Sequence, residues 1–120
     1  MTLEIRAVRE KGVLDKERIV LAADANEDIG QYVLFSTRST GDNKVSSRVR
    51  RTLWLPDYQV EAGDLVVIYT KSSAQRLKEK NNDDGTKTVF IYWGSSEPVW
   101  NLGDDAAVLV KMEDWDWKKV

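Results

Sequence analysis

The most concentrated charge of one sign in this sequence is a run of arginines. It comprises Arg48, Arg50 and Arg51, with Lys44 and Arg38 upstream. Such a cluster can neutralise phosphates and release their counterions, which gives affinity for a polyanion without sequence specificity. The same charges also suit the solvated edge of a sheet, where they discourage pairing with another strand. The sequence therefore predicts either a polyanion or acidic-protein contact at Arg48, Arg50, Arg51 and Lys44, or a soluble strand edge.

Tryptophans form a second group, with five in 120 residues. Exposed tryptophans on a β-sandwich can stack on sugar rings, whereas buried ones stabilise a core or plug its rim. Trp54 and Trp100 fit the core or rim role. Trp115 and Trp117 share a face if the C-terminus is extended, and they are the best candidates for an exposed apolar partner contact. Trp93, beside a short loop, is a further candidate for that contact.

Acid–base catalysis has little support in the sequence. Adjacent carboxylates occur at residues 83–84, 104–105 and 113–114, in polar turns where nothing predicts the burial that would separate their pKa values. The sequence has no histidine and no cysteine, which removes the commonest general base, the thiolate nucleophile and zinc–thiolate sites. We therefore predict no catalytic residue, no metal ligand, no cofactor and no enzymatic activity.

The segments that would position these groups are mostly predicted strands. Alternating or β-branched apolar runs predict strands at residues 3–8, 18–22, 31–36, 48–55, 65–70, 86–93 and 106–112. Turn-forming Gly, Asn and Asp separate them, which is typical of a sandwich or barrel. A turn or two of helix is expected within 72–80, and residues 37–47 and 71–86 are predicted to be long polar loops, either functional or disordered.

Length and charge restrict the class of protein further. A chain of 120 residues fits one domain covering residues 1–120, which needs no metal or disulfide for stability. The net charge of −2 gives no global attraction to nucleic acid or membrane, so a polyanion site has to be a local patch. The sequence shows neither a signal peptide nor a membrane span. We expect a cytoplasmic location, although a removed signal peptide would leave no trace.

Four segments, taken in order, resemble the lamin tail domain. They are a glutamate followed by a strand at 17–21, a leucine–aromatic strand at 28–34, a proline–glycine turn with a valine-rich strand at 54–68, and an Asn-x-Gly-Asp turn feeding a small-apolar strand at 99–109. That family is an immunoglobulin-like β-sandwich found in nuclear lamins and many bacterial proteins. The resemblance spans residues from about 3 to 112, and it implies a stand-alone bacterial-type member acting as an accessory or interaction unit.

The turn residues Asn101, Gly103 and Asp104 are interpreted as structural. An asparagine side chain mimics a backbone turn, and glycine takes a step with positive φ. Asp104 can then accept backbone N–H bonds where the turn ends. A calcium loop would need more oxygen ligands in register than this stretch supplies.

Together these observations predict an all-β protein, an immunoglobulin-like antiparallel β-sandwich of about seven to nine short strands. The predicted function is a non-catalytic interaction module that binds a protein partner or a polyanion. One alternative is a carbohydrate-binding module that uses exposed tryptophans. Another is a DNA-binding accessory domain that uses the basic strand. The expected partner is another protein or a second copy of the chain, with no membrane partner.

Overall fold

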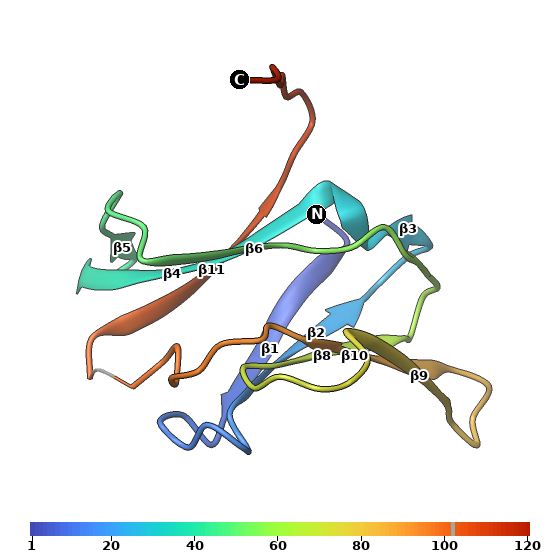
Figure 1. Ribbon diagram of the computed structural model, residues 1–120. Helices are drawn as coiled ribbons and strands as arrows, with labels where there is room; N and C mark the ends of the chain where they lie inside the picture. The colour runs from blue at the N-terminus through green and yellow to red at the C-terminus, as the bar shows by residue number, and fades with distance from the viewer. Residues whose placement is uncertain (102) are drawn as a thin grey trace.

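The computed structural model describes residues 1–101 and 103–120, and it is all-β (Figure 1). The strands are β1 (Leu3–Arg9), β2 (Arg18–Ala23), β3 (Glu27–Asp28), β4 (Tyr32–Gly41), β5 (Lys44–Val45), β6 (Arg51–Trp54), β7 (Gln59–Val60), β8 (Leu65–Tyr69), β9 (Leu77–Asn81), β10 (Lys87–Tyr92) and β11 (Asp105–Lys111). One turn of 3-10 helix, η1 (Ile29–Gln31), precedes β4. Of these strands, β3, β5 and β7 have two residues each. The eight longer ones match the predicted number.

One layer is a five-stranded sheet in the order β1-β2-β8-β10-β9. Most neighbours in it are antiparallel, as expected, but β8 and β10 run parallel. The reason is the route of the chain. After β8 the chain passes to the outer position as β9, then returns between β8 and β9 as β10.

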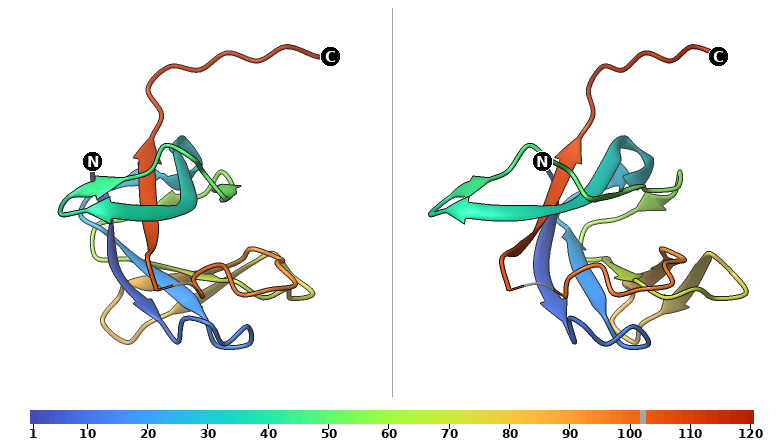
Figure 2. Two further views of the ribbon diagram at one scale, coloured as in Figure 1. Left: turned by 90° about the vertical axis from the view of Figure 1, so that its left-hand side faces the viewer. Right: turned by 60° about the vertical axis from the view of Figure 1, so that its left-hand side comes forward.

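The second layer is built around β4, which pairs with β11 on one side and β6 on the other. At its far end β4 turns back as β5. Figures 1 and 2 show the two layers facing each other, with the C-terminal segment leaving the body of the molecule after β11. The short β3–β7 ladder lies at one end.

Apolar side chains from both sheets form a single core. The largest fully buried members include Leu3, Ile19, Leu21, Tyr32, Leu34, Ile68 and Ile91. Trp100, in the segment before β11, is 2% exposed and closes this core, as its core assignment predicts. Trp93 packs edge-on against Trp100, with ring centroids 5.6 Å apart.

A buried carboxylate fastens the segment that carries Trp100. Glu17 has no exposed surface, and its Oε1 accepts the backbone N–H groups of Val99 at 2.8 Å and Trp100 at 2.9 Å. The Thr70 hydroxyl donates to the same oxygen at 3.0 Å, and the Gly12 N–H donates to Oε2 at 3.2 Å. Because buried polar atoms need such hydrogen-bond partners, Glu17 joins the beginning of β2 to the end of β8 and to residues 99–100.

The predicted strand over 48–55 was too long. Only Arg51–Trp54 forms β6, and residues 48–50 have no strand structure. The Thr37 hydroxyl donates to the carbonyl oxygens of Ser46 and Arg48, at 2.7 and 3.1 Å. These bonds hold residues 46–48 in a bend against β4. The side chains of the arginine run therefore do not alternate between two faces of a strand, as the predicted strand requires.

Both predicted long loops contain strands. Much of 37–47 is the β4–β5 hairpin, and 71–86 includes β9. Residues 72–80, expected to include a helical turn, contain no helix. The error has one physical cause. Strands β5 and β9 lie at sheet edges, and the far end of β4 is exposed, so backbone pairing holds these segments without any apolar side-chain pattern.

Candidate functional site

A cavity of about 510 Å³ lies where β6, η1 and the end of β11 meet. Its lining includes Asp28, Gly30, Trp54, Asp57, Met112 and Trp115. We call this site the tryptophan cleft. Concave sites with aromatic walls and a few convergent polar groups are the usual form of binding sites.

Two tryptophans form the wall of the cleft. Trp54 ends β6, and its indole Nε1–H donates to the Gly30 carbonyl oxygen at 2.8 Å. Trp115 packs edge-on against it, with ring centroids 4.9 Å apart and an interplanar angle of 87°. Trp54 is 49% exposed and Trp115 is 58% exposed. The two rings therefore form a right-angled corner that is open to solvent.

Two carboxylates lie in the same cleft. Asp28 Oδ1 accepts the backbone N–H groups of Gly30 at 2.8 Å and Tyr58 at 3.0 Å, which fixes its side chain at the start of η1. Asp57 is exposed, and its Oδ1 lies directly over Gly30. A Cβ added to Gly30 would lie 2.1 Å from that oxygen and 3.0 Å from the Asp57 Cα. Glycine at position 30 is therefore what allows Asp57 to occupy this place.

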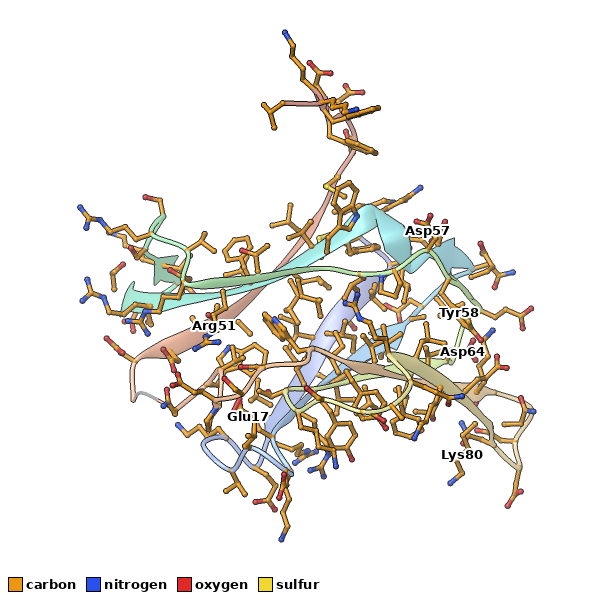
Figure 3. All side chains as sticks on the ribbon, viewed as in Figure 1. Glu17, Arg51, Asp57, Tyr58, Asp64 and Lys80 are labelled. Atoms are coloured by element: carbon orange, nitrogen blue, oxygen red, sulfur yellow. The ribbon has the colours of Figure 1, made fainter. Side chains whose placement is uncertain are left out.

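A polar cluster beside the cleft holds the segment that carries Asp57. The Tyr58 hydroxyl donates to Glu79 of β9, and Lys87 Nζ lies 3.4 Å from Glu79 Oε1 and 4.8 Å from the centre of the Tyr58 ring. The hydrogen bond to Glu79, together with burial, raises the pKa of Tyr58 to about 12. The same hydrogen bond lowers the pKa of Glu79. Asp57 and Tyr58 lie at one end of the sandwich (Figure 3).

A second cluster fixes the point from which the C-terminal segment leaves. Glu27 accepts hydrogen bonds from Tyr32 Oη at 2.8 Å and from Thr2, and it lies 2.7 Å from Lys111 Nζ. Burial by itself would raise the pKa of Glu27, but the bonds from Lys111, Thr2 and Tyr32 outweigh burial and lower it. The Met112 N–H donates to the Gln31 carbonyl at 2.7 Å. The segment leading to Trp115 thus begins at a fixed place.

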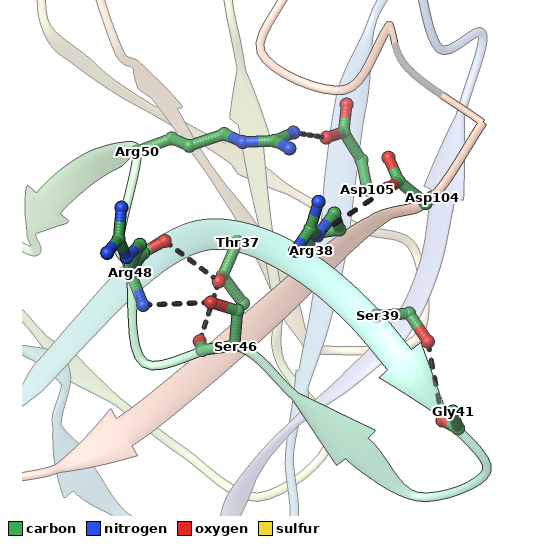
Figure 4. Close-up of polar contacts among 9 residues, drawn as sticks. All are labelled: Thr37, Arg38, Ser39, Gly41, Ser46, Arg48, Arg50, Asp104 and Asp105. Atoms are coloured by element: carbon green, nitrogen blue, oxygen red, sulfur yellow. Dashed lines mark hydrogen bonds and ion pairs between the residues drawn. The ribbon is translucent and has the colours of Figure 1, made fainter.

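The predicted basic site lies at the opposite end of the same sheet. A cavity of about 340 Å³ is lined by Arg38, Ser46, Arg48, Val49 and Arg50. The three arginines of this site, Arg38, Arg48 and Arg50, are called the arginine cluster (Figure 4). The Arg48 N–H also donates to Ser46 Oγ at 3.1 Å, which holds the backbone of the cluster in a tight turn.

Carboxylates balance part of the arginine cluster. Arg50 is paired with Asp105, and Arg38 Nε lies 3.8 Å from Asp104 Oδ2 (Figure 4). Among the residues that the structure describes, Arg48 belongs to no ion pair. Its guanidinium is therefore the cation of the cluster that is available to a ligand.

Two residues predicted for the basic contact lie elsewhere. Arg51 projects from β6 toward the other layer, where it donates to Ser95 Oγ at 3.1 Å and to Glu97 Oε2 at 3.2 Å. Lys44 is exposed on β5, opposite Gly41, and does not line the cavity. The structure thus brings together Arg48 and Arg50, adds Arg38, and separates Arg51 from them.

The predicted partner-contact tryptophans also separate. Trp115 lines the cleft, whereas Trp117 is 75% exposed and belongs to the segment beyond it. Trp93 is half-buried against Trp100 and therefore belongs to the core side of the molecule. Trp54, which the sequence assigned to a core or rim role, is the missed member of the site. Its exposure follows from its place at the end of a strand beside Gly30, and the sequence pattern does not show this.

The turn before β11 is present. Gly103 and Asp104 lie in it, and Asn101 precedes it, while the intervening residue 102 lies outside the described part of the chain. The Asp104 carbonyl accepts the Ser39 N–H at 2.7 Å, and its side chain faces Arg38. Asp104 thus meets β4 through its carbonyl and Arg38 through its side chain.

Within residues 1–101 and 103–120, no group of three or more acidic side chains is arranged to hold a metal ion. No helix in the same residues is long and apolar enough to span a membrane. A comparison with models of known families finds no match, and a comparison with curated proteins finds none either. The resemblance to the lamin tail domain, including its immunoglobulin-like topology, therefore stays a prediction.

Proposed function

We propose that this protein is a non-catalytic binding module that takes a segment of another protein in the tryptophan cleft. The observation that carries the proposal is the exposed right-angled pair of Trp54 and Trp115 beside a cavity of about 510 Å³. Tryptophans dominate the energetics of protein contacts because they bury a large, rigid surface at a small cost in side-chain entropy.

The wall of the cleft combines a fixed part with an adjustable one. Trp54 is held by strand pairing with Val33 of β4 and by its hydrogen bond to Gly30. Trp115 follows the last strand, so no sheet pairing restrains its backbone. A rigid anchor beside an adaptable one suits a partner segment that packs between them.

The corner geometry favours a peptide over a sugar. A sugar ring stacks on one flat, open aromatic face. Here the ring planes of Trp54 and Trp115 meet at 87°, so a ligand against one ring meets the edge or face of the other. A side chain that enters the corner can contact both rings at once.

A random peptide display library selected against the wild-type protein tests this proposal. We expect enriched peptides whose affinity, measured by calorimetry, falls about tenfold or more on Trp115→Ala, because the lost indole is worth roughly 1.5 kcal/mol or more. Trp117→Ala is the matched control and leaves the affinity unchanged. Failure to enrich any peptide, or equal loss in both variants, would rule the proposal out. Saturable binding in a parallel glycan panel would favour the carbohydrate alternative.

The arginine cluster supports a second candidate function, polyanion binding. Arg48 has no ion-pair partner among the described residues and lies beside a cavity of about 340 Å³. The planar guanidinium of arginine is suited to pairing with oxyanions such as phosphate through two N–H donors. We expect retention of heparin or duplex DNA that weakens steeply with salt and is lost on Arg48→Ala. Arg9→Ala removes the same charge from an exposed position on β1 and serves as the control. Binding that is insensitive to salt, or equal in both variants, would remove this candidate.

A further inference from the structure

We infer that the tryptophan cleft recognises an arginine side chain of the partner segment. This inference rests on the proposed function and specifies its ligand chemistry. It starts from the composition of the cleft, in which two indole rings and the carboxylates of Asp28 and Asp57 face one cavity. Aromatic faces and carboxylates attract the same class of group, an organic cation.

The hydrogen bonding of the cleft leaves acceptors for such a cation. Asp28 Oδ1 is occupied by two backbone N–H groups, but no described group donates to its Oδ2 or to the carboxylate of Asp57. The only indole donor of Trp54 is used by the Gly30 carbonyl. Trp54 can therefore contact a ligand through the face of its ring, and the two aspartates can accept hydrogen bonds through their free carboxylate oxygens.

The charged side chains next to the cleft are mainly acidic, although Arg76 lines a neighbouring cavity with Trp54, and Lys118 and Lys119 follow Trp117. The C-terminal segment that brings Trp115 also carries Glu113, Asp114 and Asp116, all exposed. The cation at the end of β11, Lys111, is paired with Glu27 at 2.7 Å. A cleft bordered mainly by carboxylates raises the local concentration of cationic groups, although the whole chain has a net charge of only −2.

The guanidinium group fits this arrangement better than an ammonium group does. It is planar, it pairs with a carboxylate through two parallel N–H donors, and it stacks on an indole face at the same time. An ammonium group is a compact and strongly hydrated charge that gains less from a ring face. The cleft supplies both contacts that a guanidinium can make, because the indole rings of Trp54 and Trp115 lie beside two carboxylates.

Titration with small probes tests the inference. N-acetyl-arginine amide, its lysine analogue and its citrulline analogue are added to the ¹⁵N-labelled protein, and the Gly30 amide and Trp54 indole N–H signals are followed. We expect saturable shifts with arginine, weaker binding of lysine, and no binding of citrulline, which has nearly the same shape without the charge. Citrulline binding as well as arginine, or lysine binding as well as arginine, would overturn the inference.

Variants locate the probe in the cleft. Asp57→Asn and Trp115→Ala should each weaken arginine binding by about tenfold. Asp42→Asn, in the exposed β4–β5 turn, and Trp117→Ala are the matched controls and should leave it unchanged. Equal effects in variant and control would contradict the assignment.

The failure of this inference can be told from the failure of the proposed function. If library peptides bind at the cleft but keep their affinity when every arginine is replaced by citrulline, the arginine assignment is wrong and the binding function stands. If no peptide binds, the binding function itself is wrong. If citrulline replacement removes binding, both are supported.

Discussion

Gly30 shows how one residue determines the shape of the cleft. The space where a side chain would begin is filled by the carboxylate and the Cα of Asp57, while the Gly30 carbonyl and N–H hold Trp54 and Asp28. The sequence marks this glycine only as the residue before a strand. The contact with Asp57, twenty-seven positions later in the numbering of the chain, exists only after folding.

Replacement of Gly30 by alanine therefore tests the architecture of the site. We expect Gly30→Ala to lower the free energy of unfolding by about 1–3 kcal/mol through overpacking, and to weaken peptide binding because Asp57 and Trp54 must shift. Urea denaturation and calorimetry measure the two effects. Adding Asp57→Ala removes the nearest atom and should recover part of the stability. Full stability and affinity in Gly30→Ala would contradict the described contact.

Glu17 carries a second prediction at the level of single residues. Glu17→Ala leaves the buried N–H groups of Val99 and Trp100 without their acceptor, so the free energy of unfolding should fall by about 2–4 kcal/mol. Chemical denaturation measures this. Glu4→Ala, at an exposed position of β1, is the control. A loss no larger than in that control would show that Glu17 does not hold this segment.

The chemistry of these residues could be predicted from the sequence only in part. The sequence predicts Trp115 as an exposed partner contact, and in the structure its ring is exposed and lines the cleft. It does not reveal Trp54 as its partner, because 61 positions separate the two in the chain and they come together only when β6 and β11 both pair with β4. The role of Glu17 is hidden for the same reason, since its partners lie beyond β8 and β10.

At the scale of elements, Tyr58 and Glu79 connect the segment after β6 to the edge strand β9. The hydrogen bond to the Glu79 carboxylate raises the pKa of Tyr58 to about 12, from an ordinary value of 10.0. Because the folded state holds this proton more tightly than the unfolded state, the stabilisation is fully present below pH 10. It is lost as the pH rises toward about 12.

Glu79→Gln should therefore return the pKa of Tyr58 toward its ordinary value. Ultraviolet titration of the wild type and the variant, each compared with its Tyr58→Phe counterpart, isolates this tyrosine from the other three. Glu61→Gln, in the exposed turn before β8, is the control and leaves the titration unchanged. An unshifted Tyr58 in the wild type would contradict the bond to Glu79.

The elements themselves divide into those that the sequence predicts and those that it does not. Strands β1, β2, β8, β10 and β11 have a buried face, and their apolar pattern places them within one or two residues. Strand β9 carries Lys78, Glu79 and Lys80, all exposed, so its sequence has the composition of a loop. It forms because the edge of β10 supplies partners for its backbone hydrogen bonds. The residues of β9 themselves therefore carry no pattern from which the strand could be predicted.

At the scale of the whole molecule, the two candidate sites occupy opposite ends of one sheet. Strand β4 begins beside the tryptophan cleft and passes Arg38 of the arginine cluster. The six residue steps from Tyr32 to Arg38 span roughly 20 Å in an extended strand. The sequence predicts contacts at Arg48, Arg50 and Trp115, but it does not predict that the two sites lie at opposite ends of one sheet, which follows from the pairing around β4.

Sites this far apart with no shared contacts should act independently. We expect Arg48→Glu to abolish heparin retention and leave the affinity for library peptides unchanged. Trp115→Ala should do the reverse. Heparin chromatography and calorimetry on the same two proteins measure both effects. A loss of both activities in either variant would show that the two ends form a single site.

The binding role of the tryptophan cleft is tested most directly by indole N–H spectroscopy with a selected library peptide. The five tryptophans give separate ¹⁵N-indole signals that can be assigned by substitution. The cleft predicts that saturating peptide shifts the signals of Trp54 and Trp115 and leaves those of the buried Trp100 and the outlying Trp117 in place. Shifts confined to Trp117 or Trp93, with Trp54 and Trp115 unmoved, would contradict it.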